Sequence, residues 1–531
     1  MSVRNGVALL IALSTLALLV ACGGSSSPKP VPPPSGAFSN SNLNGTYVFS
    51  SSGVDANGDF LAMTGILLAN GSGSISGGTV DVIGQEINLL SPVAQPITGG
   101  SYNITSDGRG QISFNTTTAN SSGTATGVTF TLDLVLTTNS HGLVTEYDSN
   151  GTGSGTIDLQ STVSQGQIAG AYTFGLSGTG GGTSGLPLSM VGAMTLDATG
   201  SATTGLQDIN NDGGYTGVAA LSTSSFVNLT STPGTAQIIS GSGTFGFDVY
   251  PIDPTHLKFI ENDGAFLLSG DVYTQATSIS SGQLVYTMAG EDSGGAPIDV
   301  GGWLTNTGGT ISAGLEDFND ALTVGQGLGI SGGGFSTLSG GRSTLSLNGF
   351  VNGAASDLAG TYTFAAYPFT YSGGTGIQLL EIDNLGITSG AAYPQSSTAL
   401  AAPPEGYGFN LSGANPNGEE DDIAEFTTTT NGFSGIVDLN DETVLSSGKS
   451  LQTTAFTAPD GNGRGSATTN YWEFNFYVVN TTTYILLETD TSQVGQGTFE
   501  QQGSSLGGTV QSVASILRPA VRLHSPLKRR H

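Results

Sequence analysis

The stretch LVTEYDSNGTGSGTIDLQ, residues Leu143–Gln160, contains the pattern that decides the fold. Its Glu-x-Asp, Gly and Gln recur three more times at the same internal spacing, and the Glu-to-Glu separations are 115, 120 and 107 residues. The four matches are Glu146-Asp148-Gly155-Gln160, Glu261-Asp263-Gly270-Gln275, Glu381-Asp383-Gly390-Gln395 and Glu488-Asp490-Gly497-Gln502. Self-similarity at a regular interval predicts four copies of one structural unit.

Two further motifs recur in register with this pattern. Each unit contains Gly-x-x-Asp upstream of its Glu-x-Asp, at Gly78/Asp81, Gly205/Asp208, Gly314/Asp317 and Gly435/Asp438. In the last three units an Asn stands two residues after the Asp, at Asn210, Asn319 and Asn440. Each unit also opens with Tyr-x-Phe or Tyr-x-Met, at Tyr47, Tyr172, Tyr286 and Tyr407. The duplication therefore covers whole units and not a single turn.

Within a unit, short segments of alternating apolar and polar residues are separated by turn residues. The segment TFTLDLVL, residues 129–136, is an example, and Asn70-Gly71 and Asn150-Gly151 are hairpin turns. No helical pattern of 10–15 residues lies between the segments, which excludes parallel αβ folds. Seven or eight short strands per unit predict an all-β fold of four tandem antiparallel up-and-down barrels, with a β-sandwich as the alternative. We favour the barrel because closure removes exposed sheet edges.

The predicted organisation follows from these motifs. The units are expected at 43–160, 168–275, 282–395 and 404–502, after a signal peptide at 1–21 and a Pro-rich flexible tether at 22–42, and before a basic, disordered tail at 503–531.

The first residues predict export and lipid attachment. Arg4 precedes an apolar run from Val7 to Val20, which is too short to span a bilayer and is typical of a signal peptide. Leu19-Val20-Ala21-Cys22 resembles a bacterial lipobox, which implies cleavage before Cys22 and lipidation of its thiol; the alternative is an unmodified thiol after an ordinary signal peptide. Because Gly23, and not Asp, follows the Cys, this resemblance favours the outer membrane or cell surface. Cys22 is the only Cys, so no internal disulfide is expected.

Charge is distributed very unevenly along the chain. All 40 acidic residues lie between Asp55 and Glu500, and five basic residues among them leave this body with a net charge of −35. Such a body would repel nucleic acid, which we exclude as a partner. The stretch after Gln502 has no acidic residue and five basic ones, Arg518, Arg522, Lys528, Arg529 and Arg530. We expect a solvated terminus there, with anionic lipid or the acidic body as alternative contacts.

Together these features resemble a group of uncharacterised Gly/Ser/Thr-rich, tandem-repeat bacterial lipoproteins. The resemblance rests on the Cys22 lipobox, on unit openings such as LNGTYVF (43–49), on the turn DGRG (107–110) and on closings such as ILLETD (485–490). It implies a cell-envelope location and brings no activity with it. The units are loosely similar to small avidin-like and lipocalin-like barrels, a similarity of fold alone.

The repeated Glu-x-Asp is the first candidate for chemistry. The side chains of residues i and i+2 of a strand point to the same face. Two carboxylates separated by this distance along a strand can act on a glycoside. The structural alternative is that Glu146, Asp148, Glu261, Asp263, Glu381, Asp383, Glu488 and Asp490 accept hydrogen bonds from turn amides, or pair with the recurring Arg109, Arg342 and Arg464 to clasp each barrel end. We favour the structural role over ligand binding and over catalysis.

Calcium is the second candidate. Asp208, Asn210 and Asp212 match the start of a calcium loop, but Ala219 stands where an EF-hand needs a bidentate Glu, which leaves a looser site or a simple Asx-rich turn. A shared catalytic His or zinc site is excluded, because the positions of His141 and His256 hold Gly376 and Thr483 in the last two units.

We therefore expect a lipid-anchored, non-enzymatic protein of the cell envelope. We expect no cofactor, with calcium as the one candidate. The protein would serve as a surface binding or structural module, and repeated weak sites for polysaccharide would give avidity. The alternatives are a secreted hydrolase using Glu-x-Asp and a calcium-stabilised adhesin. The sequence identifies neither the ligand nor the oligomeric state.

Overall fold

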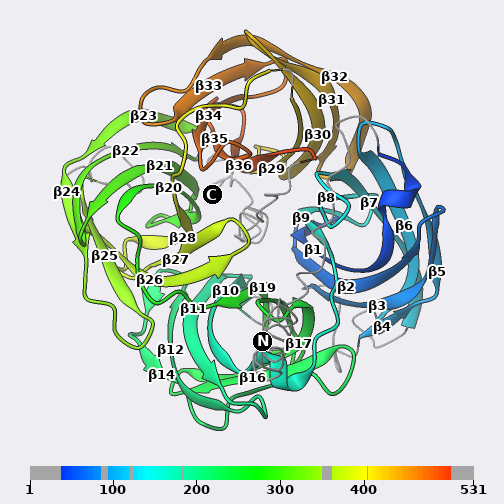
Figure 1. Cartoon of the computed structure of the whole chain (residues 1–531), viewed down its shortest axis with the longest axis horizontal. Helices are drawn as coiled ribbons and strands as arrows, with labels where there is room; N and C mark the ends of the chain where they lie inside the picture. Colours follow the sequence, from blue (N-terminus) through cyan, green and yellow to red (C-terminus); the bar gives the residue numbers. More distant parts are fainter. Residues whose placement is uncertain are drawn as a thin grey trace, which may run out of the picture. The chain divides into compact units, whose positions relative to one another are not determined.

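Antiparallel strands dominate the chain, as the alternating segments and hairpin turns predict. The computed structural model describes residues 38–84, 94–119, 125–180, 185–349, 361–403 and 405–503. Four sheets follow one another along the sequence, at 44–159, 170–274, 282–394 and 406–501, and we call them units 1 to 4 (Figure 1). In the described residues no helix is long and apolar enough to cross a membrane.

Unit 1 forms a closed barrel in which neighbouring strands are neighbours in sequence. Its sheet order is β2-β1-β9-β8-β7-β6-β5-β3-β4, and pairing of β2 with β3 closes the barrel, with β4 added beside β3. Its strands are β1 (Asn44–Asp55), β2 (Phe60–Asn70), β3 (Ser74–Gly84), β4 (Gln95–Ile97), β5 (Gly99–Ile104), β6 (Arg109–Ala119), β7 (Ala125–Leu136), β8 (His141–Tyr147) and β9 (Gly151–Leu159).

Unit 2 follows the same plan with a less complete ladder. Its ten-stranded sheet curls round, and isolated bridges pair Ser201 with Phe226 and Leu221 with Ser240. Its strands are β10 (Gly170–Gly180), β11 (Pro187–Leu196), β12 (Ala202–Asn211), β13 (Gly214–Tyr215), β14 (Ala219–Ala220), β15 (Phe226–Asn228), β16 (Gly234–Ser240), β17 (Gly243–Asp253), β18 (His256–Glu261) and β19 (Phe266–Thr274).

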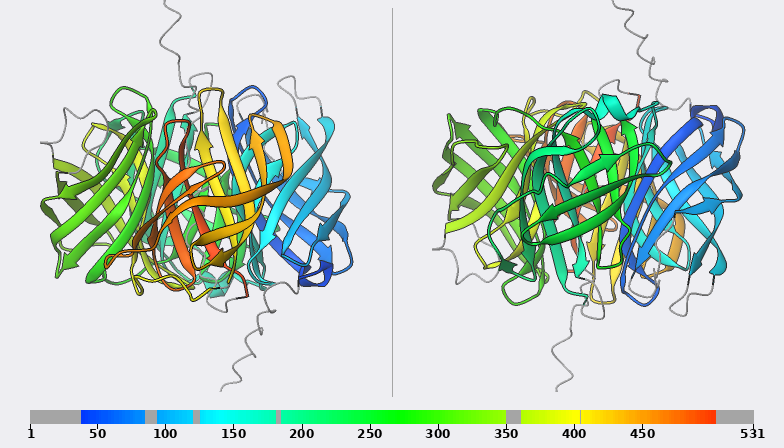
Figure 2. Two further views of the ribbon diagram at one scale, coloured as in Figure 1. Left: turned by 90° about the horizontal axis from the view of Figure 1, so that it is seen from above. Right: turned by 90° about the horizontal axis from the view of Figure 1, so that it is seen from below.

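Units 3 and 4 are closed barrels, which confirms the predicted architecture (Figure 2). Unit 3 contains β20 (Gly282–Asp292), β21 (Pro297–Thr307), β22 (Thr310–Asp320), β23 (Thr323–Ile330), β24 (Gly332–Phe335), β25 (Ser343–Asn348), β26 (Thr361–Tyr371), β27 (Gly374–Glu381) and β28 (Gly386–Pro394). Unit 4 contains β29 (Gly406–Ala414), β30 (Glu419–Thr429), β31 (Gly432–Asp441), β32 (Val444–Thr457), β33 (Arg464–Thr469), β34 (Glu473–Val478), β35 (Thr483–Glu488) and β36 (Val494–Gln501).

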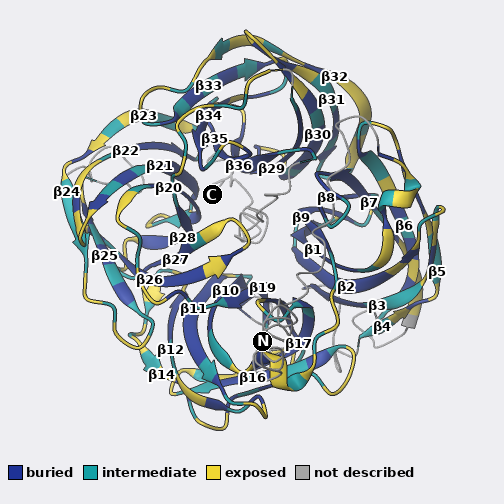
Figure 3. Ribbon diagram, in the orientation of Figure 1, coloured by how far each residue is buried: buried dark blue, intermediate teal, exposed yellow. Residues whose placement is uncertain are grey.

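Several strands are buried on both faces, because one face fills a barrel and the other packs on a neighbouring unit. In β35, Tyr484 and Leu486 lie in the core of unit 4, whereas Ile485 and Leu487 pack with residues of unit 3. Successive side chains on a strand point to opposite faces, so the same segment serves both purposes. Figure 3 shows the contrast between buried strands such as β9 and the exposed β32.

We call each contact between two units a joint. Apolar clusters of nine residues at joint 1–2 and of five at joint 2–3 lie between consecutive units, and a cluster of ten joins units 3 and 4 with Tyr273 of unit 2. Unit 4 also contacts unit 1, where Val135, Leu143 and Ile423 form a smaller cluster. The contacts therefore form a cycle of four joints, of which joint 4–1 has no direct chain connection.

The structure changes the predicted ends of the body. Residues 38–42, expected in the flexible tether, pack on unit 1: Phe38 is buried in its core cluster and Asn40–Asn42 form the 3-10 helix η1. A second such helix, η2, spans Gln165–Ile168 between units 1 and 2. Gly503, expected in the tail, donates its N–H to the Thr137 carbonyl. The signal peptide, Cys22, the rest of the tether and residues 504–531 lie outside the described residues.

The repeated Gly of the closing strand has a common cause in all four units. A Cβ at Gly155 would lie 1.8 Å from the Ser50 carbonyl oxygen of β1. The corresponding distance is 2.1 Å at Gly270, Gly390 and Gly497, in each case to the first strand of the unit. Only Gly lets the closing strand approach the opening strand this closely, and a barrel depends on that pairing.

Replacing Gly155 with Ala is therefore expected to destabilise the protein by about 1–3 kcal/mol, because the methyl group overlaps the Ser50 carbonyl. Gly127→Ala is the matched control, since nothing lies within 4 Å of its Cβ position, and it should change the free energy of unfolding by less than about 0.5 kcal/mol. Urea denaturation of the two variants measures both values, and equal stabilities would contradict the argument.

Candidate functional site: the joints between units

The Asp of each Glu-x-Asp holds the turn that follows its strand. Asp148 accepts the Asn150 N–H at 2.7 Å with one oxygen and the Thr131 N–H at 2.6 Å with the other. The other units repeat this arrangement: Asp263 accepts from Gly246 and Ala265, Asp383 from Thr363 and Leu385, and Asp490 from Glu473 and Ser492. The four Asp residues thus accept turn and strand amides, one of the structural roles that the sequence suggests.

The Glu of the same motif is buried in every unit. Glu146, Glu261, Glu381 and Glu488 are at most 1% exposed. Burial, aided by the neighbouring Asp263, raises the pKa of Glu261 to about 10, and burial likewise raises the pKa of Glu146 and Glu488 well above the ordinary value. Glu261 therefore retains its proton at neutral pH, and none of the four side chains reaches the solvent, where a dissolved substrate would meet them.

The main chain at Glu-x-Asp receives the repeated Asn of the preceding unit in the cycle. Asn440 of unit 4 donates its amide to the carbonyls of Glu146, at 2.7 Å, and Gly151, at 3.0 Å, in unit 1. Asn210 donates in the same way to Glu381 and Gly386 of unit 3, and Asn319 to Glu488, Asp490 and Gln493 of unit 4. Two of the sequence motifs therefore meet across the joints.

The repeated Arg also contacts the neighbouring unit, and this corrects the prediction that it pairs with Glu-x-Asp at the end of its own barrel. Arg342 and Arg464 do not pair with a Glu-x-Asp carboxylate. Arg342 of unit 3 forms a bidentate pair with Asp208 of unit 2, with distances of 2.6 and 2.9 Å. Arg464 of unit 4 makes the same pair, at the same distances, with Asp317 of unit 3. Both Asp residues belong to Gly-x-x-Asp and are fully buried.

A Tyr on the strand next to each Arg completes this arrangement. Tyr367 donates its hydroxyl to Asp208 at 2.6 Å, and Tyr477 donates to Asp317, which also accepts the Asn475 amide. A buried carboxylate is stable only when a cation and enough donors surround it. Each Asp therefore depends on side chains that the following unit supplies.

The two remaining joints depart from this pattern. Arg109 of unit 1 pairs with Asp107 of its own turn at 3.1 Å and lies 3.6 Å from Asp438 of unit 4. At joint 1–2 the Arg is missing, because Pro233 occupies the corresponding position of unit 2.

Asp81, the Gly-x-x-Asp carboxyl of unit 1, receives the Tyr250 hydroxyl of unit 2 and lies beside the buried Asp248. Burial and the charge of Asp248 raise the pKa of Asp81 to about 8, so this carboxyl pair holds a shared proton at neutral pH.

The closing Gln of a unit makes a third kind of contact across the joints. Gln160 donates to the Pro251 carbonyl of unit 2 at 2.6 Å, and Gln395 donates to the Val478 carbonyl of unit 4 at 2.7 Å. Gln502 donates to the Asp107 and Leu136 carbonyls of unit 1, which brings the last unit onto the first. The repeated polar residues thus link each unit to the next one in the cycle.

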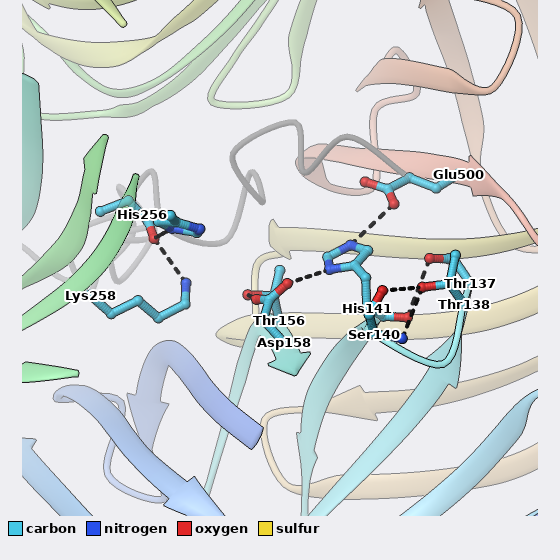
Figure 4. Close-up of polar contacts among 10 residues, drawn as sticks. Thr137, Thr138, Ser140, His141, Thr156, Asp158, His256, Lys258 and Glu500 are labelled. Carbon is cyan, nitrogen blue, oxygen red and sulfur yellow. Dashed lines mark hydrogen bonds and ion pairs between the residues drawn. The ribbon is translucent and has the colours of Figure 1, made fainter. Parts of the chain in front are cut away.

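A charged cluster lies where units 1 and 4 meet and extends towards unit 2 (Figure 4). His141 Nδ1 lies 2.7 Å from Asp158, and its Nε2 lies 3.1 Å from Glu500 of unit 4. Burial alone would lower the pKa of His141, but the charges of Glu500 and Asp158 raise it to about 10. With both ring nitrogens bound to carboxylates, His141 is a fixed cation and cannot act as a general base.

In unit 2, Asp271 accepts from His256 at 2.7 Å and from Lys258 at 2.9 Å. Burial would raise the pKa of Asp271, but the charge of Lys258 and the contact with His256 hold it well below the usual range. The charges of Lys258 and His256 also act on Asp158 of unit 1. Charged side chains of units 1, 2 and 4 therefore interact within this cluster.

The side chains of two of the three residues proposed for calcium have other partners. Asp208 receives Arg342 and Tyr367, and Asn210 donates to carbonyls of unit 3. Asp212 follows β12 in a hairpin turn, where its φ is 52°. In the described part of the chain, no group of three His, Cys, Asp or Glu side chains is arranged to hold a metal ion.

Sequence reasoning missed the Tyr donors and the acids that face His141. Tyr250, Tyr367 and Tyr477 hold one position of the repeat, three residues after a core Phe. Asp158 and Glu500 hold another, two residues before the closing Gln. Alignment of the units on these positions would have revealed both sets, although not their partners in other units.

Comparison with known proteins adds no assignment. The chain matches no known family model, and no curated protein is similar to it in sequence. Among solved structures, kievitone hydratase from Nectria haematococca is similar over 43% of this chain and 90% of the other, at 9% sequence identity. The TM-score is 0.17, which is too low to carry an argument about function.

Removing the Arg464 guanidinium with Arg464→Gln is expected to lower the free energy of unfolding by about 3–5 kcal/mol, because Asp317 would remain buried without its cation. Arg109→Gln is the matched control and should cost about 0–1 kcal/mol, since its partner Asp107 is partly exposed and its contact with Asp438 is long, at 3.6 Å. Chemical denaturation gives both values. A double variant with Asp317→Asn should recover part of the loss, whereas equal losses for the two Arg variants would refute the assignment.

Stability should also fall as pH rises above about 5, because buried groups hold protons more tightly in the folded state than in the unfolded chain. Asp81 and Glu420, with pKa values raised to about 8 and about 7, destabilise the fold once the unfolded carboxyl has ionised. His141 stabilises it below the unfolded His pKa, and this contribution is lost as pH rises through about 10.

The free energy of unfolding should fall by about 1.4 kcal/mol per pH unit for each extra proton that the folded state holds. Urea denaturation at several pH values, followed by Trp fluorescence, measures it. Asp81→Asn should reduce the slope between about pH 5 and pH 8. Constant stability over this range would contradict the protonated state of the buried carboxyls.

Proposed function

We propose that this protein is a lipid-anchored, non-enzymatic module of the cell envelope, attached through Cys22 to the outer membrane or cell surface. Its four units act as one structural body that binds a surface partner, and polysaccharide is the class of ligand that we propose. One observation carries the proposal: the repeated Asp, Asn and Gln, the residues most suggestive of a repeated active site, make hydrogen bonds that fix turns or join units.

The burial of Glu-x-Asp favours this proposal over hydrolysis. A glycosidase needs a carboxyl pair on either side of a bound substrate, one protonated and one ionised. Glu146 is 1% exposed, and Asp148 is bound to two main-chain amides. Glu146 is therefore closed to the solvent and Asp148 is occupied by main-chain amides, whereas a hydrolase would need both carboxyls open to its substrate.

The positions of the two Trp side chains do not favour a polysaccharide site that depends on aromatic stacking. Trp472 is buried and donates its indole N–H to Asp422 at 2.9 Å, and Trp303 packs against the cluster of joint 3–4. Polar side chains on the outer strands, such as those of the exposed β32, are the surface that we propose for weak and repeated contacts.

The test of the binding role uses the mature full-length protein and a double variant, Glu146→Gln with Asp148→Asn. We expect the wild-type protein to bind one or more immobilised polysaccharides without releasing reducing sugar. The double variant should lose stability and keep this binding. Release of sugar by the wild type that the double variant abolishes would overturn the proposal in favour of a hydrolase.

The anchor is tested separately with Cys22→Ser. Labelled fatty acid should enter the wild-type protein and not the variant, and the variant should move from the membrane fraction to the soluble fraction. Equal fractionation of the two proteins would overturn the proposed attachment and leave the binding test unaffected.

A further inference from the structure

Joint 1–2 lacks the guanidinium group that joints 2–3 and 3–4 contain. In unit 4, Arg464 stands opposite Tyr477 in the pairing of β33 with β34, and both side chains reach the buried Asp of the preceding unit. In unit 2 the register of β16 with β17, continued by one residue, puts Pro233 opposite Tyr250. Tyr250 binds Asp81, but Pro233 has no cation to add. Asp81 is therefore the carboxyl from which the repeated Arg is missing.

The carboxyl pair at joint 1–2 still carries a negative charge. Burial and the charge of Asp248 raise the pKa of Asp81 to about 8, so the two carboxyls share one proton at neutral pH and retain one charge. Among the described residues, no Arg, Lys or His forms an ion pair with either carboxyl. In joint 3–4 the place of Asp248 is taken by Asn475, which donates to Asp317. The two arrangements match in charge, and joint 1–2 lacks the cation.

A cavity of about 210 Å³ lies at this joint, beside the place of the missing Arg. Pro233 lines it, together with Val249 and Pro251, the residues on either side of Tyr250. Ile66 lines it from unit 1, and none of the lining residues is charged. A single water molecule needs about 10–15 Å³ of such volume, so the cavity has room for a small organic molecule.

The equivalent place at joint 2–3 is closed. Gly341, which precedes Arg342, lies so near unit 2 that a Cβ on it would be 3.0 Å from the Ala193 side chain. Ala193 holds the position of Ile66 in the repeat, since the strand partner of each residue directly follows the Gly of Gly-x-x-Asp. The cavity is thus a local difference between two corresponding joints.

The carboxyls at joint 1–2 are also less completely covered. Asp81 and Asp248 are 4% and 5% exposed, whereas Asp208 and Asp317, which an Arg covers, are both 0% exposed. Asp81 lies on the same face of unit 1 as Ile66, because the partner of Ile66 on β3 is two residues away from Asp81, about 7 Å along the strand. Arg342 and Arg464 reach the corresponding carboxyls from the position that Pro233 holds here, so a molecule in the cavity has the same path.

We propose that the cavity at joint 1–2 binds a small alkylguanidinium compound, whose guanidinium group pairs with Asp81. The alkyl chain packs on Ile66, Val249 and Pro251, and the planar fork of the guanidinium pairs with the carboxylate as that of Arg464 does at joint 3–4. A buried carboxylate gains most from a cation that it otherwise lacks. The net charge of −35 on the body attracts cations of this kind. The site depends neither on the proposed lipid anchor nor on polysaccharide binding.

Isothermal titration calorimetry of the full chain with n-propylguanidine, which reproduces an Arg side chain, tests the proposal. We expect saturable one-to-one binding and an unfolding temperature that rises with ligand concentration. N-propylurea has a similar shape without the charge and should bind weaker by about tenfold or more, because it forms no charge-assisted hydrogen bonds. n-Butylamine carries the charge without the planar fork and should also bind more weakly than n-propylguanidine.

Four variants locate the site. Asp248→Asn copies the Asp and Asn of joint 3–4 and should retain binding. Asp81→Asn combined with Asp248→Asn removes both carboxyls and should weaken binding by about tenfold or more. Glu473→Gln removes an exposed acidic residue of unit 4 and should leave binding unchanged. Thr162→Trp fills part of the cavity from an exposed position in its wall, and should weaken binding without changing the unfolding temperature of the free protein.

No binding of n-propylguanidine, or equal affinity for n-propylguanidine and N-propylurea, would overturn the proposal. Unchanged binding by a folded double variant would overturn it as well. If the double variant does not fold, Thr162→Trp decides the question, and an unchanged affinity in that variant contradicts the site. None of these measurements involves Cys22 or a polysaccharide, so failure here is distinguishable from failure of the proposed function.

Discussion

A carboxylate removed from water must be given a cation or several donors, and in this protein the adjoining unit provides them. Asp208 and Asp317 are fully buried, and the Arg and Tyr side chains that surround them come from a unit more than 100 residues further along the chain. Separating two units would leave such a carboxylate without its cation and with fewer donors, since only the Tyr215 hydroxyl on Asp208 and the Gly327 N–H on Asp317 come from the same unit. It would also expose the apolar side chains beside the carboxylate. A single unit is therefore an incomplete structure, even though its barrel has its own core.

The four joints differ in a way that distinguishes one unit from another. Joints 2–3 and 3–4 have an Arg–Asp pair and aromatic packing, such as Tyr273 on Phe369 at 5.0 Å. At joint 4–1 an acid occupies the position of Tyr273, and Glu500 faces the buried cation His141. A Tyr in place of Glu500 would leave His141 with fewer anions, and an acid in place of Tyr273 would lose the stacking on Phe369. Matched substitutions of this kind favour one order of assembly among four similar barrels.

The fold was largely predictable from sequence because its causes are local. Strand alternation, hairpin turns and the repeated Gly155 each act within one unit, and the Asp148 turn is visible in the same short stretch. The partners of the polar motifs were not predictable in this way. Arg342 and Asp208 are separated by 134 residues, so no local spacing connects them, and the expected pairing of Arg with Glu-x-Asp was wrong for that reason. The structure of residues 38–42 was also missed, since a Pro-rich sequence before them gives no sign that Phe38 enters the core.

Phe38 and Gln502 both bind the turn between β5 and β6 of unit 1, through the Ser106 and Asp107 carbonyls, and this has a consequence for how the chain relates to its own fold. Units 1 and 4 associate side by side without a direct peptide connection, and the two ends lie at the same turn. A circular permutant that joins these ends through a short linker and opens the segment between units 1 and 2 would keep all four interfaces. Because the four joints close into a cycle, moving the break in the chain to another linker would change the connectivity and keep the order of the units around the cycle.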